Sequence, residues 1–314
     1  MSDQSNTPEW QVISQLVSSI QDEQKRARRW GIFFKSLFYI VIFSLIAMGV
    51  SNSDSASMAP AKSHVAIVNV FGPILAGSNA SAEKLLPSIE DAFTTSTAKA
   101  VMLNINSPGG SPVQAGILFD EIQRLKAVYP DKPVYAVISD TGASGAYYIA
   151  AAADFIYADK ASSVGSIGVV GSGFGFTELI AKLGIERRTY TAGKNKDFLD
   201  PFLPQNLEDA LQFQAILDEV HQQFIEQVKV GRGDRLSGDP AVFSGAIFHG
   251  KKALELGLVD GLGSLYSVVR DQADGIDVVY YSPEKTPFEA VVDELGVQTS
   301  SAVSWGLNQG FTLQ

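Results

Sequence analysis

Residues 31–50, GIFFKSLFYIVIFSLIAMGV, form an almost unbroken apolar run, which limits what this chain can fold into more than any other feature. At 1.5 Å of rise per residue, a helix over this run covers about the thickness of a bilayer's hydrocarbon core, ~30 Å. We therefore predict one transmembrane helix over 31–50. A cleaved signal peptide is the alternative, although residues 1–30 precede the run and no small-x-small cleavage pattern follows it closely.

Basic residues on one side of this segment predict its orientation. The cluster KRARR at 25–29 precedes the segment, whereas residues 51–62 carry one acid and one lysine. Because positive residues stay on the cytoplasmic side of a membrane, residues 1–30 are predicted to be a cytoplasmic N-terminal tail. The serine- and alanine-rich residues 51–62 are predicted to be a linker outside, leading to the rest of the chain.

Composition excludes several classes of site and partner. The chain has no cysteine, which excludes disulfides, thiolate metal sites and a cysteine nucleophile. A formal net charge of −10 leaves no broad basic surface for a phosphate backbone, so we expect no nucleic acid partner. Any nucleophile must therefore be a hydroxyl, an amine or a carboxylate.

Strand-like and helix-like segments alternate through the rest of the chain. The predicted strands are 64–74, 100–106, 133–139, 154–158, 186–191 and 277–281, and the predicted helices are 82–95, 113–128 and 207–230. Nearly continuous apolar strands indicate a sheet buried on both faces. We therefore predict an α/β domain over 63–285, followed by a C-terminal tail over 286–314.

Two glycine-rich turns stand between an apolar strand and a helix. In SPGG at 107–110, consecutive glycines let backbone N–H groups face outward at a helix N-terminus, which is how a chain builds an oxyanion hole. In TGASGAYY at 141–148, Ser144 can project its hydroxyl clear of the backbone, beside the N–H of Gly145. The ordinary alternatives are a simple Pro-Gly-Gly turn and a serine that caps a helix.

A serine nucleophile needs a base. The three histidines, His64, His221 and His249, lie in settings that indicate structural roles. A lysine can replace histidine when burial lowers the pKa of its amine towards neutrality. The run AGKNKDF offers Lys194 and Lys196, and the physical pattern alone does not choose between them.

Five runs carry a resemblance to a known family. They are NSPGG, GASGAYY, SVGSIGVVG, AGKNKDFLDPF and GLVDGLG, in that order, and together they span nearly all of 63–265. With them the chain resembles the signal peptide peptidase A family of bacterial S49 serine proteases, in its short form with one catalytic domain. The resemblance implies an α/β fold of the ClpP/crotonase type and a reaction that needs no metal or cofactor.

The resemblance also implies the roles of individual residues. It implies Ser144 as the nucleophile, Lys196 as the general base, Ser166 as the residue that orients the lysine amine, and Gly110, Gly109 and Gly145 as the oxyanion hole. Whether Lys194 assists stays open.

A membrane-anchored serine endopeptidase is the function that the resemblance implies. Its substrates would be cleaved signal peptides or similar hydrophobic unfolded peptides, at the outer face of a bacterial inner membrane that the chain crosses once. The catalytic domain would be periplasmic or otherwise extracytoplasmic, in a homo-oligomer of tetramer to octamer size. The alternatives are a catalytically weak membrane scaffold of the same fold, which intact Ser144 and Lys196 argue against, and a crotonase-type acyl-CoA hydratase or isomerase, which the predicted anchor argues against.

Overall fold

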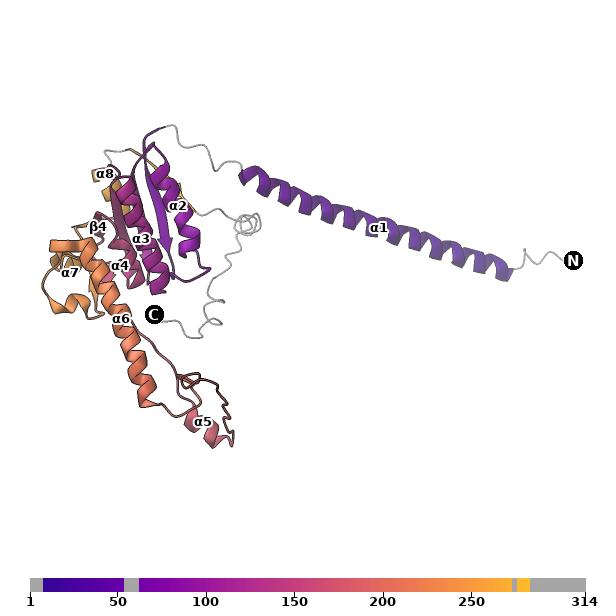
Figure 1. The fold of residues 1–314 in the computed structure, drawn as a ribbon. Coiled ribbons are helices and arrows are strands. Elements are labelled where there is room, and N and C mark those ends of the chain that lie inside the picture. Colours follow the sequence, from indigo (N-terminus) through magenta and orange to yellow (C-terminus); the bar gives the residue numbers. More distant parts are fainter. Residues whose placement is uncertain (1–7, 54–61, 273–275, 283–314) are drawn as a thin grey trace. The chain divides into compact units, whose positions relative to one another are not determined.

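The computed structural model describes residues 8–53, 62–272 and 276–282 (Figure 1), with side chains in the first range described over 16–44. The chain divides into two units, one holding the N-terminal helix and the other holding the sheet. The predicted tail 286–314 lies outside the described residues, as do residues 54–61 of the predicted linker 51–62.

Helix α1, Pro8–Ser53, forms the first unit and runs without a break through the predicted cytoplasmic tail and the apolar run. Among the residues that the structure describes, none of the helices has the length and apolar character needed to span a bilayer. The last part of the predicted span, residues 45–50, lies outside the range of described side chains. The transmembrane assignment therefore stays a prediction.

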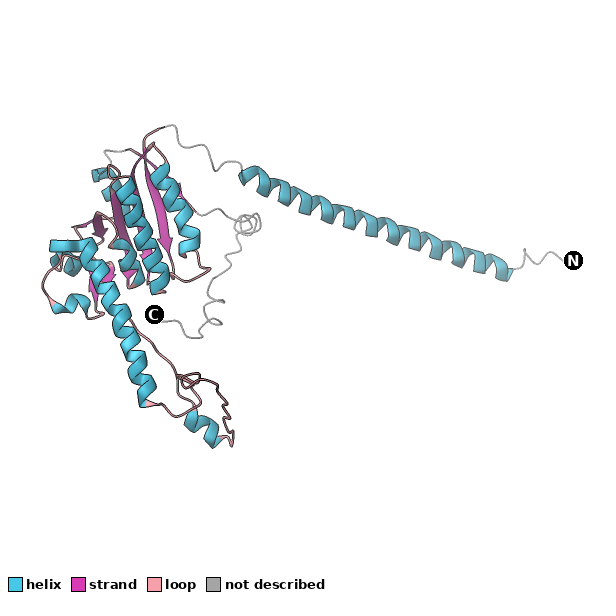
Figure 2. Cartoon of the chain, in the orientation of Figure 1, coloured by secondary structure: helices cyan, strands magenta, loops and turns pink. Residues whose placement is uncertain are grey.

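A single, mostly parallel sheet organises the second unit (Figure 2), with strand order β6-β5-β3-β2-β1-β8 and with β4 pairing both β3 and β7. The strands are β1 His64–Phe71, β2 Ala98–Ser107, β3 Val134–Ala143, β4 Phe155–Ala158, β5 Ser163–Gly165, β6 Ile247–His249, β7 Gly261–Leu262 and β8 Asp277–Tyr281. The pairing of β5 with β6 is antiparallel and the other pairings are parallel. Parallel neighbours need crossover connections, which the helices supply.

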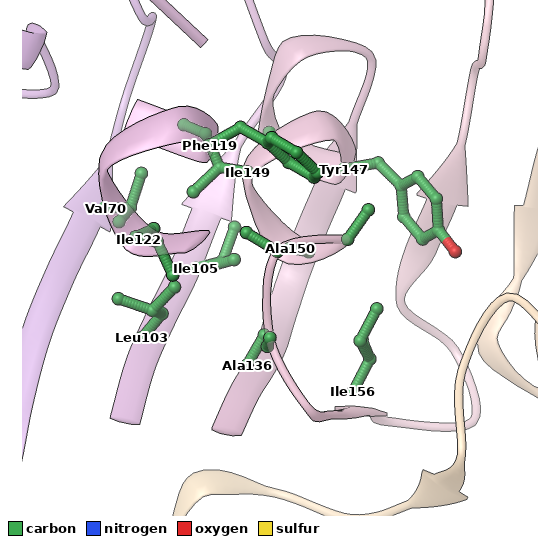
Figure 3. Packing of buried hydrophobic residues seen from close by; sticks show 14 of the residues in the cluster. Val70, Leu103, Ile105, Phe119, Ile122, Ala136, Tyr147, Ile149, Ala150 and Ile156 are labelled. Atoms are coloured by element: carbon green, nitrogen blue, oxygen red, sulfur yellow. The ribbon is translucent and has the colours of Figure 1, made fainter. Parts of the chain in front are cut away.

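Helices cover both faces of this sheet. The helices of this unit are α2 Ala82–Thr94, α3 Pro112–Val128, α4 Gly145–Ala150, α5 Thr177–Lys182, α6 Leu207–Arg232, α7 Gly250–Glu255 and α8 Leu265–Gln272, of which α5 lies away from the sheet. The larger core lies under α2, α3 and α4, where Phe119 and Ile149 pack over Leu103 and Ile105 of β2 (Figure 3). A smaller cluster on the opposite face includes Val268 of α8. The predicted α/β class is confirmed, with both faces of the central strands buried.

Residues 186–191 are a miss of the sequence analysis, because they form no strand. They belong to an exposed segment, 170–206, that leaves the sheet after β5 and ends where α6 begins; we call it the arm. Figure 1 shows α5, which lies in the arm, beside the end of α6 that is remote from the sheet. The sequence pattern of a half-buried strand requires a neighbouring strand, and the arm of a single chain has none among the described residues.

A buried ion pair fastens the other end of α6 to the sheet. The Arg232 side chain is fully buried and donates to the Asp260 carboxylate, with Nη1 2.7 Å from Oδ2, and to the Gly257 carbonyl. In the same connection, the Leu258 carbonyl accepts a 2.7 Å hydrogen bond from the buried Tyr147 hydroxyl of α4. One short segment, 257–260, thus anchors both α4 and α6.

Removing the carboxylate of Asp260 should strongly destabilise the fold. Burial alone would raise the pKa of Asp260, but hydrogen bonds from Arg232 and the Ile156 N–H reverse this, and its pKa is lowered overall. We predict that Asp260→Ala lowers the free energy of unfolding at pH 7 by about 3–5 kcal/mol, because it leaves a buried guanidinium unpaired. Urea denaturation would measure this loss.

The pH dependence of that loss has a definite sign. A carboxyl whose pKa is lower in the folded state contributes stability above its unfolded pKa, and the contribution is lost as pH falls through the folded value. The difference in free energy of unfolding between wild type and Asp260→Ala should therefore shrink below about pH 4.

Asp271→Ala, which removes the exposed partner of Arg270, is the control and should cost under about 1 kcal/mol. Equal losses of stability in the two variants would contradict a stabilising role for the buried Arg232–Asp260 pair.

Candidate functional site

A cleft of about 580 Å³ opens where the parallel strands end, and residues that follow β1, β2, β3 and β5 line it. Ligands of α/β proteins commonly bind at this edge of the sheet, outside the carboxyl ends of the strands. Four of the predicted site residues line the cleft together, namely Gly109, Gly110, Ser144 and Ser166. Gly145 lines a smaller pocket of about 140 Å³ beside Ser144.

Ser144 is held in an unusual backbone conformation between β3 and α4. Its φ is 53° and its ψ is −126°, in the region that glycine adopts most easily. The surrounding structure fixes this conformation, because its N–H donates to the Gly165 carbonyl at 2.9 Å and its carbonyl accepts from Tyr148. Its side chain makes no helix-capping hydrogen bond, so the alternative of an ordinary cap is excluded. The hydroxyl is free to act in the cleft.

The SPGG turn lies directly against Ser144. Ile74 pairs with this turn as a short parallel bridge, donating to the Gly109 carbonyl at 2.9 Å and accepting from Ser111 at 2.8 Å. In such a bridge the N–H of the intervening residue, Gly110, points away from Ile74. That N–H would lie 3.3 Å from a β-carbon built on Gly145, so the N–H groups of Gly110 and Gly145 are close neighbours. The pair can donate to one anionic oxygen beside Ser144.

Only glycine fits at both positions of the turn. A β-carbon on Gly109 would lie 2.7 Å from the Ser144 β-carbon, and one on Gly110 would collide with the Ile74 carbonyl oxygen. Both residues also have positive φ, 97° and 152°. Close approach to Ser144 therefore explains the glycine at position 109, and close approach to the Ile74 backbone explains the glycine at position 110.

Ser166 also lines the cleft, one residue beyond β5. Its φ is 51°, and its N–H donates to the Ala246 carbonyl at 2.8 Å. The preceding residue, Gly165, accepts from Ser144, so the two serines are carried by hydrogen-bonded segments. The structure thus brings Ser144 and Ser166 to one cleft.

The two candidate lysines lie elsewhere, on the arm. Lys196 is exposed, its N–H donates to the Gly193 carbonyl at 3.2 Å, and it does not line the cleft of its own chain. Lys194 is also exposed and pairs with Glu208 at the start of α6, and this hydrogen bond raises the pKa of its amine. A raised pKa keeps the amine protonated, which disfavours Lys194 as a base.

His221 of α6 is a cleft residue that the sequence analysis did not single out. It lines the cleft with Ser144 and Ser166, whereas His64 contacts Tyr281 and His249 caps α7. No local motif marks His221, because only the packing of α6 across the end of the sheet brings it there.

Comparison with known proteins gives one matching family model and several relatives. The family model described as peptidase family S49 matches residues 126–278. A protein of Brucella abortus named Na(+)/H(+) antiporter NhaA is 39% identical over 246 residues, covering 76% of this chain and 33% of that protein. The putative signal peptide peptidase SppA of Enterococcus faecium is 34% identical, covering 66% of this chain and 57% of that protein.

A further relative matches over more of its own length. The putative protease slr0021 of Synechocystis is 32% identical, and the match covers 64% of this chain and 70% of that protein. The match thus spans about a third of the Brucella protein, just over half of the Enterococcus protein and more than two thirds of the Synechocystis protein.

The backbone strain at Ser144 makes a testable prediction about stability. Glycine adopts positive φ without steric cost, so Ser144→Gly should have a free energy of unfolding about 1 kcal/mol higher than Ser144→Ala. Chemical denaturation of both variants would measure the difference. At Ser88, inside α2, the order should reverse, with Gly less stable than Ala by about 1 kcal/mol. An alanine variant at position 144 that is as stable as the glycine variant, or more stable, would show that Ser144 is not strained.

Proposed function

Because this chain belongs to peptidase family S49, we propose that it is a serine endopeptidase in which Ser144 is the nucleophile and Lys196 the general base. One observation carries the proposal: the Ser144 hydroxyl has no capping partner and lies in a cleft beside the N–H groups of Gly110 and Gly145. A nucleophile with two adjacent donors is what acyl transfer requires.

The proposed reaction proceeds through an acyl-enzyme. The neutral Lys196 amine accepts the hydroxyl proton while Ser144 Oγ bonds to the substrate carbonyl carbon, and the carbonyl electron pair moves onto its oxygen. The N–H groups of Gly110 and Gly145 stabilise this oxyanion, and Gly109 permits their approach. As the intermediate collapses, the C–N bond breaks and the leaving amine takes the proton from Lys196. Water, activated by the same amine, then hydrolyses the ester, while the Ser166 hydroxyl orients the lysine throughout.

The exposed position of Lys196 favours a homo-oligomer in this proposal. Lys196 can meet Ser144 only if the arm of its own chain closes or if a second copy supplies the lysine. The arm exposes large apolar side chains, with Phe174 80% and Tyr190 91% exposed, which a second copy of the chain would cover favourably. We therefore propose an assembly of tetramer to octamer size in which the arm of one subunit reaches the cleft of its neighbour.

Hydrophobic unfolded peptides, such as cleaved signal peptides, are the proposed substrates. The small pocket beside Ser144 is lined mainly by apolar groups, including Val113, Val169 and Phe224, and suits an apolar side chain next to the scissile bond. The relative named signal peptide peptidase supports the same class.

A membrane location is also proposed. The apolar run 31–50 and the basic cluster 25–29 support a single-pass anchor in a bacterial inner membrane, with the N-terminus cytoplasmic and the catalytic domain outside. Such an anchor would place the cleft on the side of the membrane where the proposed substrates are released.

Substitution of either dyad residue should abolish peptide hydrolysis. We predict that Ser144→Ala and Lys196→Ala each lower kcat by at least about a thousandfold, because one lacks the nucleophile and the other the base. Lys194→Ala is the matched control and should stay within about threefold of wild type, since that amine is paired with Glu208. Turnover of a fluorogenic hydrophobic peptide by the full chain in detergent micelles would measure all three.

Mixing the two inactive variants separates the possible positions of the base. If the dyad forms between subunits, exchanged oligomers of Ser144→Ala and Lys196→Ala contain some intact sites and recover part of the activity. If mass spectrometry shows that subunits have exchanged and activity is still not recovered, both dyad residues of a site come from one chain. Full activity of Lys196→Ala alone would refute the lysine base, and an inert wild type with an intact oligomer would favour a scaffold.

A further inference from the structure

His221 holds one wall of the cleft through a single hydrogen bond. Its Nε2 lies 3.1 Å from the Ile167 carbonyl oxygen, and its side chain lines the cleft. A carbonyl can only accept, so Nε2 carries the hydrogen and His221 is the donor. Nδ1 is then the ring nitrogen that is left to accept a bond or bind a proton.

The carbonyl that His221 contacts belongs to a segment with little regular pairing of its own. Strand β5 ends at Gly165, and Ser166 follows it with a φ of 51°. Gly165 pairs within the sheet as the last residue of β5. Beyond that pairing, the Gly165 carbonyl accepts from Ser144, the Ser166 N–H donates to Ala246, and the Ile167 carbonyl accepts from His221. The first two fix the residues up to Ser166, and the third fixes the residue directly after it.

The helix that carries His221 is itself firmly placed. Three residues further along α6, Phe224 packs edge-on against Tyr148 of α4, with ring centroids 4.9 Å apart. Tyr148 donates its N–H to the Ser144 carbonyl at 3.0 Å. Arg232 locks the end of the helix through its buried pair with Asp260. His221 therefore connects a rigid helix to the wall on which Ser166 lies.

We propose that His221 is a positioning residue: its Nε2–H bond to the Ile167 carbonyl keeps Ser166 in the place from which the hydroxyl orients the amine of the base. The inference rests on the proposed function, in which Ser166 orients Lys196. His221 itself transfers no proton in this account. Its contribution is geometric, and any side chain that places an N–H at the same point can replace it.

Two substitutions show whether His221 acts as a hydrogen-bond donor or through its ionisable ring. In His221→Gln the amide nitrogen is the same number of bonds from Cα as Nε2, so the donor is kept while the ionisable ring is removed. In His221→Leu the donor is lost. We expect His221→Leu to lower kcat by about tenfold to a hundredfold with KM within about threefold of wild type, and His221→Gln to restore kcat to within about threefold.

A control and a second readout separate positioning from folding. Gln222→Leu changes the neighbouring residue on the exposed side of α6, where its amide contacts Glu226, and should leave kcat unchanged. Hydrogen exchange of the full chain, followed by mass spectrometry, should be faster in 165–168 for His221→Leu and normal for His221→Gln. This readout does not depend on turnover.

The possible outcomes are distinct. Loss in His221→Leu with rescue in His221→Gln, in both kcat and exchange, supports the proposal. Wild-type kcat and exchange in both variants would overturn it while leaving the Ser144 and Lys196 assignment intact. Loss of all activity in both variants, together with an active Lys196→Ala, would make His221 the base and overturn the proposed dyad as well.

Discussion

The parallel pairing of β2 with β3 is the constraint on which the rest of the site depends. Their register places Ser107 opposite Gly142, after a shift that follows Ile105. Because both strands run the same way and end at the same level, the turn after β2 and the turn after β3 must meet. The glycines of one turn and Ser144 of the other are then brought within contact, although more than thirty residues separate them in the sequence. The cleft is therefore a consequence of strand register. The two turns lie so close together that the turn after β2 has room only for glycine at positions 109 and 110.

The second unit combines a rigid body with an exposed arm. The sheet, α3 and α4 share one closely packed core, and the Arg232–Asp260 pair fixes the end of α6 to it. The arm, by contrast, has apolar side chains facing solvent and carries both candidate lysines. In the proposed site the nucleophile lies on the rigid body and the base lies on the arm. The site is therefore complete only when an arm brings Lys196 to Ser144. If the arm reaches the cleft of a neighbouring subunit, as proposed, the site is completed only when the subunits assemble.

Features set by local sequence could be predicted, and features set by distant contacts could not. The α/β class followed from segment alternation. The glycine-rich turns after apolar strands made Ser144 and the SPGG glycines candidates, and the family resemblance implied their roles. The α/β fold and membership of peptidase family S49 are confirmed, whereas the ClpP/crotonase type stays an expectation that the family resemblance implies. By contrast, whether Lys196 can reach Ser144 depends on the position of the arm, which no local motif determines. The place of His221 in the cleft depends on how α6 packs there. Arg232 shows the same limit, since the polar sequence Arg232-Gly233-Asp234 gives no sign that the arginine is fully buried.

The reactivity of Ser144 is the central claim, and covalent labelling tests it most directly. The full chain would be treated with a fluorophosphonate, which phosphonylates activated serine hydroxyls with loss of fluoride, and the modified residue located by tandem mass spectrometry. The account predicts a single adduct on Ser144, with Ser139 and Ser166 unmodified. An adduct on another residue, or peptide hydrolysis that persists in a chain whose Ser144 stays unlabelled, would contradict it.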